Sequence, residues 1–178
     1  MEVHCYPDPV LRERIRPVEE FDDALATLAR DMVKTMNEAN GLGLAGPQVA
    51  VSLSIVAVSL DTQPGNAVVL VNPEILQTDG WEVGEEGCLS FPGIYVNIGR
   101  FQRIRVRYSD TKGEPQELEA KGLLARAIQH ELDHLDGRLL VDRMSAVQRM
   151  AQRRRLRELK DRYEHRLSQS RTGSEAAR

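Results

Sequence analysis

The sequence predicts a single domain of the α+β class. Two patterns typical of amphipathic helices, near residues 22–37 and 121–137, stand on either side of several short apolar segments with strand-like composition. A charged helical pattern follows, so the order along the chain is helix, strands, helix, helix, which is typical of an α+β fold. At 178 residues the chain has the length of one domain, and we expect that domain to cover residues 1–166.

The N-terminal part is predicted to be an extended arm, a helix and a glycine-rich loop. Prolines at positions 7, 9 and 17 favour an extended, turn-rich arm over residues 1–20. Asp22 or Asp23 can cap a helix that runs to about Asn37. Its apolar positions recur at helical spacing: Leu25, Leu28, Ala29, Met32, Val33 and Met36. The loop "NGLGLAGPQV" then ends the helix, with glycines at 41, 43 and 46.

The middle of the chain is predicted to form strands. The runs "LSIVAVSL" (53–60) and "AVVLVNPEIL" (67–76) are rich in β-branched residues and bounded by turn residues. The glycine-containing stretch 80–100 mixes short strand-like pieces. "RIRVRYSD" (103–110) alternates strictly between apolar and polar residues, which indicates a half-exposed strand. "TKGEP" then reads as a hairpin turn into a further strand.

The C-terminal part is predicted to be helical. Apolar residues recur at three and four positions within 121–137, and Gly137 is placed to end that helix. A last helix is expected from Ser145 to about Leu167. The polar stretch 167–178 is expected to be a disordered tail.

Charge is distributed unevenly. The net charge is −3, but residues 143–166 hold nine Lys/Arg and three Asp/Glu, a local charge of +6. The N-terminus lacks the apolar run of a signal peptide, and no apolar stretch reaches the about 18 residues that span a membrane. With Cys5 and Cys88 as its two cysteines, the chain has no disulfide framework. We therefore expect a cytoplasmic protein with a basic C-terminal helix.

The stretch "QHELDHLDG" (129–137) carries the strongest chemical signal. His130 and His134 share one face of the predicted helix and can bind one metal ion. Glu131 lies about 100° around the helix axis, beside the ion rather than on it. This HExxH pattern is the signature of metal-assisted hydrolysis, in which the metal lowers the pKa of its water to about 7 and the glutamate takes the proton.

Two histidines do not complete a ligand set. Downstream, Glu158, Glu164 and His165 lie in an Arg-rich helix that reads as solvated. Upstream, Cys88 stands in the glycine-flanked turn "EEGCLSFPG". Cysteine with two histidines gives three protein ligands and leaves a fourth position for water.

Three separate motifs resemble those of the peptide deformylase family. They are "GLGLAGPQ" (41–48), "EGCLS" (86–90) and "QHELDH" (129–134). Their order and separation also match, and "YPDPVLR" is similar to the family's usual opening. The resemblance spans about residues 4–142.

This resemblance implies a metal-dependent hydrolase that removes the formyl group from the formylmethionine of nascent polypeptides and releases formate. One divalent ion per chain is implied, natively Fe(II), with Zn, Ni or Co as replacements. The implied roles are Cys88, His130 and His134 as metal ligands, Glu131 as general acid and base, Gln48 and the Leu89 N–H as the oxyanion hole, and Leu42, Gly43 and Glu86 at the substrate. Glu86 is also expected to pair with Arg100 and so hold the ligand loop.

The resemblance extends to fold and partners. It implies mixed or antiparallel sheets packed around a central helix that carries HExxH, with one helix before it and one after it. Nascent formylated peptides are the expected partner, together with the ribosome through residues 143–166, and neither DNA nor a membrane is expected. Tyr95 and Arg126 depart from the family pattern near the substrate. Arg126 must either point away from the methionine pocket or narrow it.

Two other functions are compatible with the residues. One is a zinc endopeptidase that uses the two histidines and a downstream glutamate. The other is a metal-stabilised ribosome-binding protein without catalysis. Substitution of Cys88 separates the first from a deformylase, and substitution of Glu131 separates the second from an enzyme.

Overall fold

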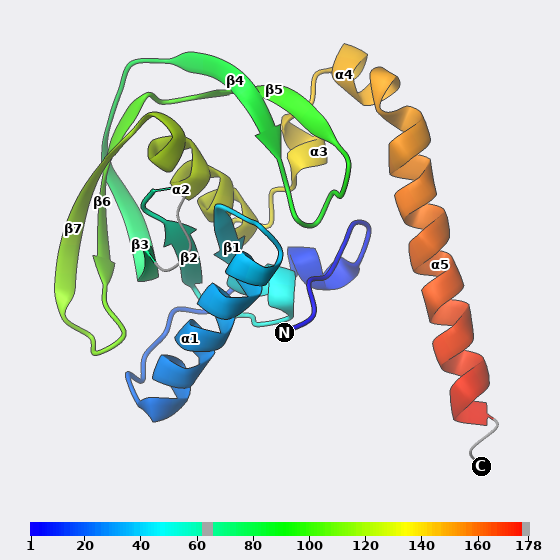
Figure 1. The fold of residues 1–178 in the computed structure, drawn as a ribbon, viewed down its shortest axis with the longest axis horizontal. Coiled ribbons are helices and arrows are strands. Elements are labelled where there is room, and N and C mark those ends of the chain that lie inside the picture. The colour runs from blue at the N-terminus through cyan, green and yellow to red at the C-terminus, as the bar shows by residue number, and fades with distance from the viewer. Residues whose placement is uncertain (62–65, 176–178) are drawn as a thin grey trace.

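The predicted α+β class is confirmed by the computed structural model, which describes residues 1–61 and 66–175. Figure 1 shows two antiparallel sheets and the helices around them. The larger sheet has the order β1-β2-β3-β6-β7: β1 Gly43–Ala45, β2 Ile55–Ser59, β3 Ala67–Asp79, β6 Arg103–Ser109 and β7 Pro115–Lys121. The smaller sheet pairs β4 Glu82–Gly87 with β5 Tyr95–Arg100.

Five α-helices and two short 3-10 helices complete the described part of the chain. The α-helices are α1 Asp23–Glu38, α2 Gly122–Leu135, α3 Leu140–Arg143, α4 Ala146–Ala151 and α5 Arg153–Glu175. The 3-10 helices, which the sequence did not indicate, are η1 Pro9–Arg12 and η2 Gly46–Val49. Within residues 1–61 and 66–175, no helix combines the length and the apolarity that a membrane span requires.

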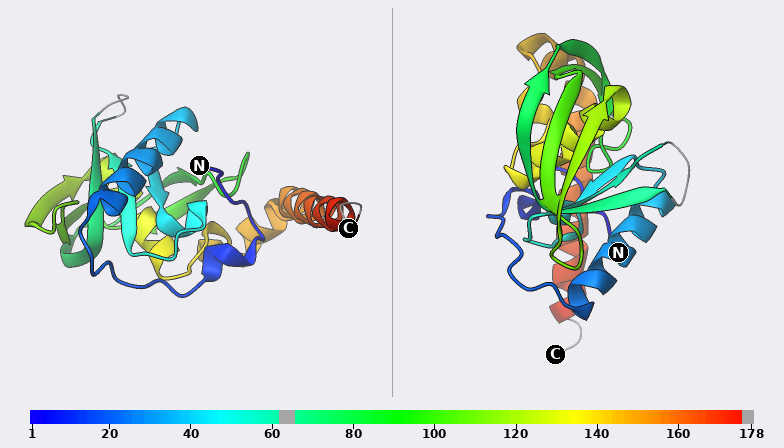
Figure 2. Two further views of the ribbon diagram at one scale, coloured as in Figure 1. Left: turned by 90° about the horizontal axis from the view of Figure 1, so that it is seen from below. Right: turned by 90° about the vertical axis from the view of Figure 1, so that its left-hand side faces the viewer.

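Helix α1 forms where its start signal and apolar stripe predict it. The Asp22 carboxylate accepts a hydrogen bond from the Leu25 N–H at 2.9 Å, which caps the first turn. The stripe is then buried in one cluster with residues of β1, β2 and β3, and Met32 and Met36 are fully buried. The helix is thereby held against the sheet (Figure 2).

Helix α2 packs against the other side of the larger sheet's core. Ile104 and Val106 of β6 are buried as the alternation predicts, and they share a cluster with Ala125 and Ile128 of α2. The arginines of β6 point the other way and pair with acidic residues on neighbouring strands: Arg103 with Asp79, Arg105 with Glu117 and Arg107 with Glu74. At β6 the sheet therefore has a charged outer face and an apolar inner face on which α2 lies, whereas over β1, β2 and β3 the face opposite α2 is covered by α1.

A further apolar cluster joins the turn after β4 to the C-terminal helices. Phe91 and Ile94 of this turn are fully buried, together with Leu156 and Leu159 of α5. The Tyr6 ring stacks on Phe91 with centroids 5.0 Å apart. Because these contacts come from three distant parts of the sequence, they fix the turn that carries Cys88.

The C-terminal region differs from the sequence prediction in two ways. The single helix expected from Ser145 is divided at Gln152 into α4 and α5. Helix α5 also continues to Glu175, so residues 167–175 are helical where a disordered tail was expected; no proline interrupts this stretch. Residues 176–178 of the expected tail lie outside the described residues. Figures 1 and 2 show α5 running along one side of the molecule.

Replacing Phe91 by alanine should destabilise the fold strongly. The ring is fully buried, so its loss leaves a cavity, and we expect the free energy of unfolding to fall by about 3–5 kcal/mol. Urea unfolding followed by circular dichroism measures the loss. Phe101→Ala is the matched control, because Phe101 is 38% exposed and its loss should cost about 1 kcal/mol. Equal losses in the two variants would contradict this account of the core.

Candidate metal centre

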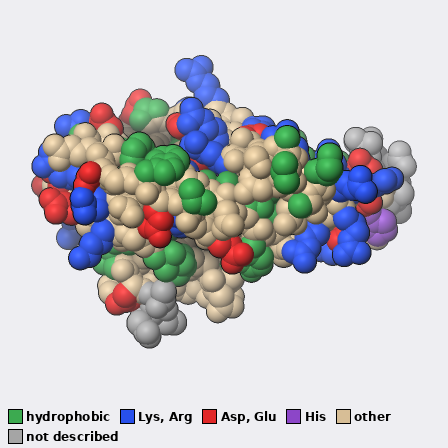
Figure 3. All heavy atoms as spheres, turned by 90° about the horizontal axis from the view of Figure 1, so that it is seen from above, with side chains coloured by type: hydrophobic (Ala, Val, Ile, Leu, Met, Phe, Trp, Pro, Cys, Tyr) green, Lys and Arg blue, Asp and Glu red, His purple; other side chains and the backbone are tan. Residues whose placement is uncertain are grey.

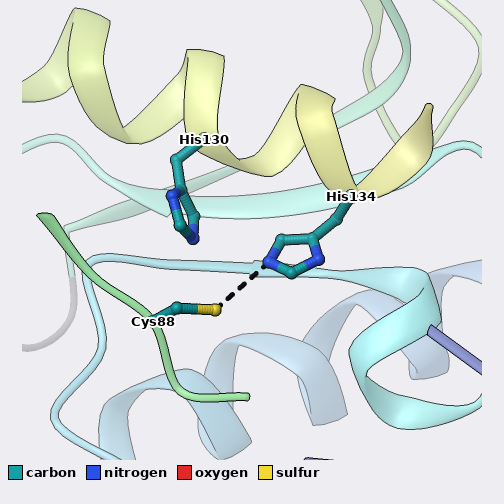
Figure 4. Close-up of side chains that lie close together, drawn as sticks. All are labelled: Cys88, His130 and His134. Carbon is teal, nitrogen blue, oxygen red and sulfur yellow. Dashed lines mark hydrogen bonds between the residues drawn. The ribbon is translucent and has the colours of Figure 1, made fainter. Parts of the chain in front are cut away.

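Cys88, His130 and His134 come together in one buried cluster (Figure 4). Their candidate ligand atoms all lie within 4.8 Å of one another. The two histidines project from one face of α2 because they are four residues apart. Cys88 approaches them from the turn after β4, and its Sγ is 3.3 Å from His134 Nε2.

The local fold shapes the turn that presents Cys88. The Phe91 N–H donates to the Cys88 carbonyl at 2.9 Å, and the Tyr6 N–H donates to the Ser90 carbonyl at 2.9 Å. Gly87 lies directly under the Tyr95 ring, since a Cβ at this position would be 2.7 Å from a ring carbon. A larger residue would therefore displace either the ring or the cysteine.

The donor set fits a divalent transition-metal ion. A thiolate and two imidazoles are ligands that Fe(II), Zn, Ni and Co accept, and three protein ligands leave a position open. Among the described residues, His130 Nε2 and Glu131 Oε2 are buried without a hydrogen-bond partner. Burying such atoms without partners is costly, and an ion beside them would satisfy the imidazole nitrogen.

Glu86 orients His130. One Glu86 oxygen lies 3.0 Å from His130 Nδ1, which leaves Nε2 directed at the cluster. Burial raises the pKa of Glu86, but the hydrogen bonds from His130 and Arg100 outweigh it and lower the pKa to about 2. Glu86 is therefore an anion that keeps the ring in one orientation.

The two histidines differ in their preferred charge. Burial lowers the pKa of His130, but the Cys88 thiolate and Glu86 raise it well above its ordinary value. Burial and the charge of His130 lower the pKa of His134 well below its ordinary value. The two neighbouring imidazoles therefore have pKa values shifted in opposite directions.

Three arginines extend this arrangement behind the candidate ligands. Arg100 donates from Nε to Glu86 at 2.8 Å and from Nη1 to Asp133 at 2.6 Å. Arg126 donates from Nη1 to Glu86 at 2.9 Å and to the Ile98 carbonyl at 2.8 Å. Arg143 pairs with the other oxygen of Asp133. The predicted pair of Glu86 and Arg100 is thus present, and Arg126, whose direction the sequence left open, turns toward β4 and β5.

Glu131 is fully buried next to the glycine loop. Burial is the largest influence on its carboxyl group and raises the pKa to about 7. A Cβ on Gly43 would lie 2.2 Å from Glu131 Oε1, so only glycine leaves room for the carboxyl group here. The loop and the acid are therefore fitted to each other.

The Gln48 amide is held in one orientation. Its Oε1 accepts from the Ala45 N–H at 2.8 Å, so its Nε2 faces Ser90 Oγ at 3.2 Å and Cys88 Sγ at 3.6 Å. Ser90 was not singled out by the sequence reasoning, although it belongs to the "EGCLS" motif. Gln48 thus places an uncharged donor beside the cysteine.

A cavity of about 510 Å³ opens onto the cluster. Seven of the predicted site residues line it: Leu42, Gly43, Glu86, Cys88, Leu89, His130 and Glu131. His134 and Gln48 lie behind this lining and are 1% exposed. Asp133 and Arg143 were missed as supporting residues, although Asp133 lies inside the "QHELDH" motif that could have indicated it. Gln129 of the same motif holds the end of β5, because its side chain accepts from the Phe101 N–H at 3.0 Å and donates to the Phe101 carbonyl at 2.9 Å.

Comparisons with known proteins agree with this geometry. Residues 1–150 match the family model for polypeptide deformylase. The peptide deformylase of Alkalilimnicola ehrlichii is 47% identical over 160 residues, which is 89% of this chain and 90% of that protein.

Solved structures agree as well. Peptide deformylase 1B of Arabidopsis thaliana, in complex with an inhibitor, has a TM-score of 0.89 at 37% identity and covers 93% of both chains. A peptide deformylase from Legionella pneumophila has a TM-score of 0.85 at 42% identity, over 92% of this chain and 96% of that one. The chain therefore belongs to the polypeptide deformylase family.

Proposed function

We propose that this chain removes the N-formyl group from nascent polypeptides with Cys88, His130 and His134 as the ligands of its metal ion. The deformylase is a metal-dependent hydrolase. The observation that carries the ligand assignment is the convergence of Cys88 with the two α2 histidines within 4.8 Å. A divalent ion bound there would polarise the formyl carbonyl and supply an activated water at neutral pH. We propose Fe(II) as the native ion, with Zn, Ni or Co able to replace it.

Glu131 is proposed as the general acid and base. A carboxyl group with a pKa of about 7 can accept a proton from water and pass it on to the leaving amine near neutral pH. Its Oε2 has no partner among the described residues, so this atom is free to carry the proton.

Gln48 and Leu89 are proposed to form the oxyanion hole. The Gln48 Nε2 is fixed beside Cys88, and an amide donates without titrating. Leu89 follows Cys88 directly and lines the cavity, so its backbone N–H belongs to the same turn. Donors held in place before reaction need no rearrangement when charge develops on the formyl oxygen.

Leu42 and Gly43 are proposed to bind the peptide backbone. Strand β1 is the edge strand at one end of the larger sheet: it pairs with β2 on one side, and its other side carries no strand of this sheet in the part of the chain that the structure describes. An extended peptide can add to such an edge. Glu86 is better assigned to positioning than to substrate contact, because both of its oxygens already accept hydrogen bonds from arginines or His130.

The remaining assignments concern the centre of the fold, the domain and the partners. We propose α2 as the central helix of one catalytic domain over residues 1–166, and a cytoplasmic location.

We also propose that α5 contacts the ribosome, because Arg153, Arg157 and Arg162 are exposed and form no ion pair within the described part of the chain. Figure 3 shows Lys and Arg side chains gathered at the end of the molecule that α4 and α5 form. An endopeptidase ligand from Glu158, Glu164 or His165 is disfavoured, since all three are exposed on α5.

Replacing Glu131 by glutamine should remove turnover while the ion remains bound. Loss of a general acid and base costs about 10²–10⁴-fold in rate. Formate release from a formyl-methionyl peptide and the metal content by elemental analysis measure the two effects. Glu114→Gln, in the exposed turn between β6 and β7, is the control and should keep wild-type activity. Normal turnover in Glu131→Gln would exclude Glu131 from the reaction.

Replacing Cys88 by serine should release the metal ion. A hydroxyl group is a poor ligand for these ions, so the metal content should fall well below one ion per chain. Cys5→Ser is the control, since Cys5 lies outside the cluster and its loss should leave the metal in place. Full metal content in Cys88→Ser would favour the endopeptidase arrangement with a downstream ligand.

Neutralising the α5 arginines should weaken ribosome binding. We expect the combined Arg153→Ser, Arg157→Ser and Arg162→Ser variant to co-sediment less, and to bind with a salt slope smaller by up to about three. Truncation is a poorer test, because Leu156 and Leu159 belong to the core.

The control for this experiment changes the net charge equally on the outer face of the sheet, with Arg103→Ser, Arg105→Ser and Arg107→Ser. Equal co-sedimentation of the α5 variant and the wild type across a salt series would remove the ribosome proposal. Formate release from a short peptide should stay unchanged in both variants.

A further inference from the structure

The C-terminal helices contact the segment Gly93–Asn97 along its backbone. Gln148 Nε2 donates to the Asn97 carbonyl at 2.7 Å, and Gln152 Nε2 donates to the Tyr95 carbonyl at 3.5 Å. The Arg155 guanidinium donates to the Gly93 carbonyl. We call these three side chains the polar ladder.

The spacing of the polar ladder matches a strand on one side and a helix on the other. Its acceptors belong to alternate residues, whose carbonyls point to the same edge of a strand. Its donors come from α4, from Gln152 between the two helices and from α5, four and then three residues apart. Hydrogen bonds from the Gln152 N–H to the Gln148 carbonyl and from the Leu156 N–H to the Gln152 carbonyl carry the helical spacing across the division, so the three donors lie on the same side. The match explains how three hydrogen bonds form in succession between the two segments.

Apolar contacts hold the same helices on the same segment. Leu156 and Leu159 of α5 are buried in one cluster with Ile94 and Val96. The polar ladder therefore does not act alone, because the leucines bring α5 to the strand and the ladder sets its register.

The other side of this segment is a wall of the cavity. Gly93, Ile94 and Tyr95 line the same cavity as Cys88, His130 and Glu131. The Tyr95 side chain is 58% exposed and lies over Gly87, next to the proposed ligand Cys88. Leu42 and Gly43 line this cavity as well, so both segments bound the cavity in which the formyl end of a peptide would reach Glu131.

We propose that Gln152 and Arg155 are positioning residues that, through the polar ladder, fix the Gly93–Tyr95 wall against which the substrate residues after formylmethionine bind. This rests on the proposed function of the same cavity. A formyl-methionyl group alone reaches only the end of the cavity at the metal ligands. A longer formyl peptide uses the wall, so a loose wall weakens its binding without changing the reacting groups.

If the polar ladder only stabilised the fold, its loss would have a different effect from the one proposed. Edge strands are often covered to prevent unwanted pairing, and such a cover would contribute to stability alone. Its loss would then change the thermal midpoint and leave the ratio of KM values for long and short substrates as it was. The two roles are therefore separated by substrate length.

The experiment compares Gln152→Ala/Arg155→Ala with the wild type, both loaded with nickel. Gln148 is kept, because its Oε1 also accepts from the Ser145 N–H and caps α4. We expect KM for a formyl-methionyl tetrapeptide to rise about five- to tenfold, as for the loss of one or two hydrogen bonds. KM for formyl-methionine amide and kcat for both substrates should stay within about twofold of the wild type.

Three further arms make the test decisive. Gln152→Lys/Arg155→Lys keeps donors at both positions and should restore the lower KM. Gln116→Ala, an exposed glutamine on β7, is the matched control and should change nothing. Hydrogen exchange should be faster across residues 91–98 in the alanine variant than in the wild type.

An unchanged ratio of the two KM values would overturn the proposal, and so would an equal loss on both substrates or a loss of kcat. A wild type that releases no formate would instead refute the proposed function. In that case the exchange arm still decides whether the polar ladder fixes the wall, since unchanged exchange across residues 91–98 would refute it.

Discussion

The arrangement of the site depends on one buried carboxylate, that of Glu86. Its two oxygens accept hydrogen bonds from Arg100, Arg126 and His130, all within 3.0 Å. Since β4 contributes the carboxylate, β5 contributes Arg100 and α2 contributes the other two groups, this anion joins the smaller sheet to the helix. A buried carboxylate is tolerated only when it is fully paired. Displacing α2 from the sheet would leave the Glu86 charge buried without its partners, which costs much free energy of folding. Because Glu86 precedes Cys88 by two residues and accepts from His130, the same pairing fixes Cys88 and His130 relative to each other.

The same charges extend to the end of α2. Asp133 accepts from Arg100 on one side and pairs with Arg143 on the other. Two carboxylates and three guanidinium groups thus form a continuous network behind the candidate ligands, and each charge in it meets at least one opposite charge. The network leaves Glu131 outside it. Burial raises the pKa of that carboxyl group to about 7 although the charges of His130 and Arg100 oppose it, whereas hydrogen bonds from His130 and Arg100 lower the pKa of Glu86 to about 2.

Local signals in the sequence determined most of what could be predicted. The Asp22 cap and the alternation of β6 depend on neighbouring residues, and the structure has both. The pairing of Cys88 with the histidines depends on how β4 meets α2, which no local pattern contains; the family resemblance supplied it. The direction of Arg126 was open for the same reason, since its acceptors are 28 to 44 residues away. The end of α5 was misjudged because polar composition does not by itself stop a helix.

The C-terminal helix α5 shows how one element can serve two surfaces. Leu156 and Leu159 face the core, while Arg153 and Arg157 are exposed to solvent. With 100° between successive residues, Arg157 lies about 160° around the axis from Leu159, so a phosphate group bound at Arg157 would not displace that leucine. Arg155 lies about 40° from Leu159 and about 160° from both Arg153 and Arg157, and it donates to the Gly93 carbonyl. A partner that bound Arg157 on the outer face of α5 would therefore leave the contact between Arg155 and Gly93 in place.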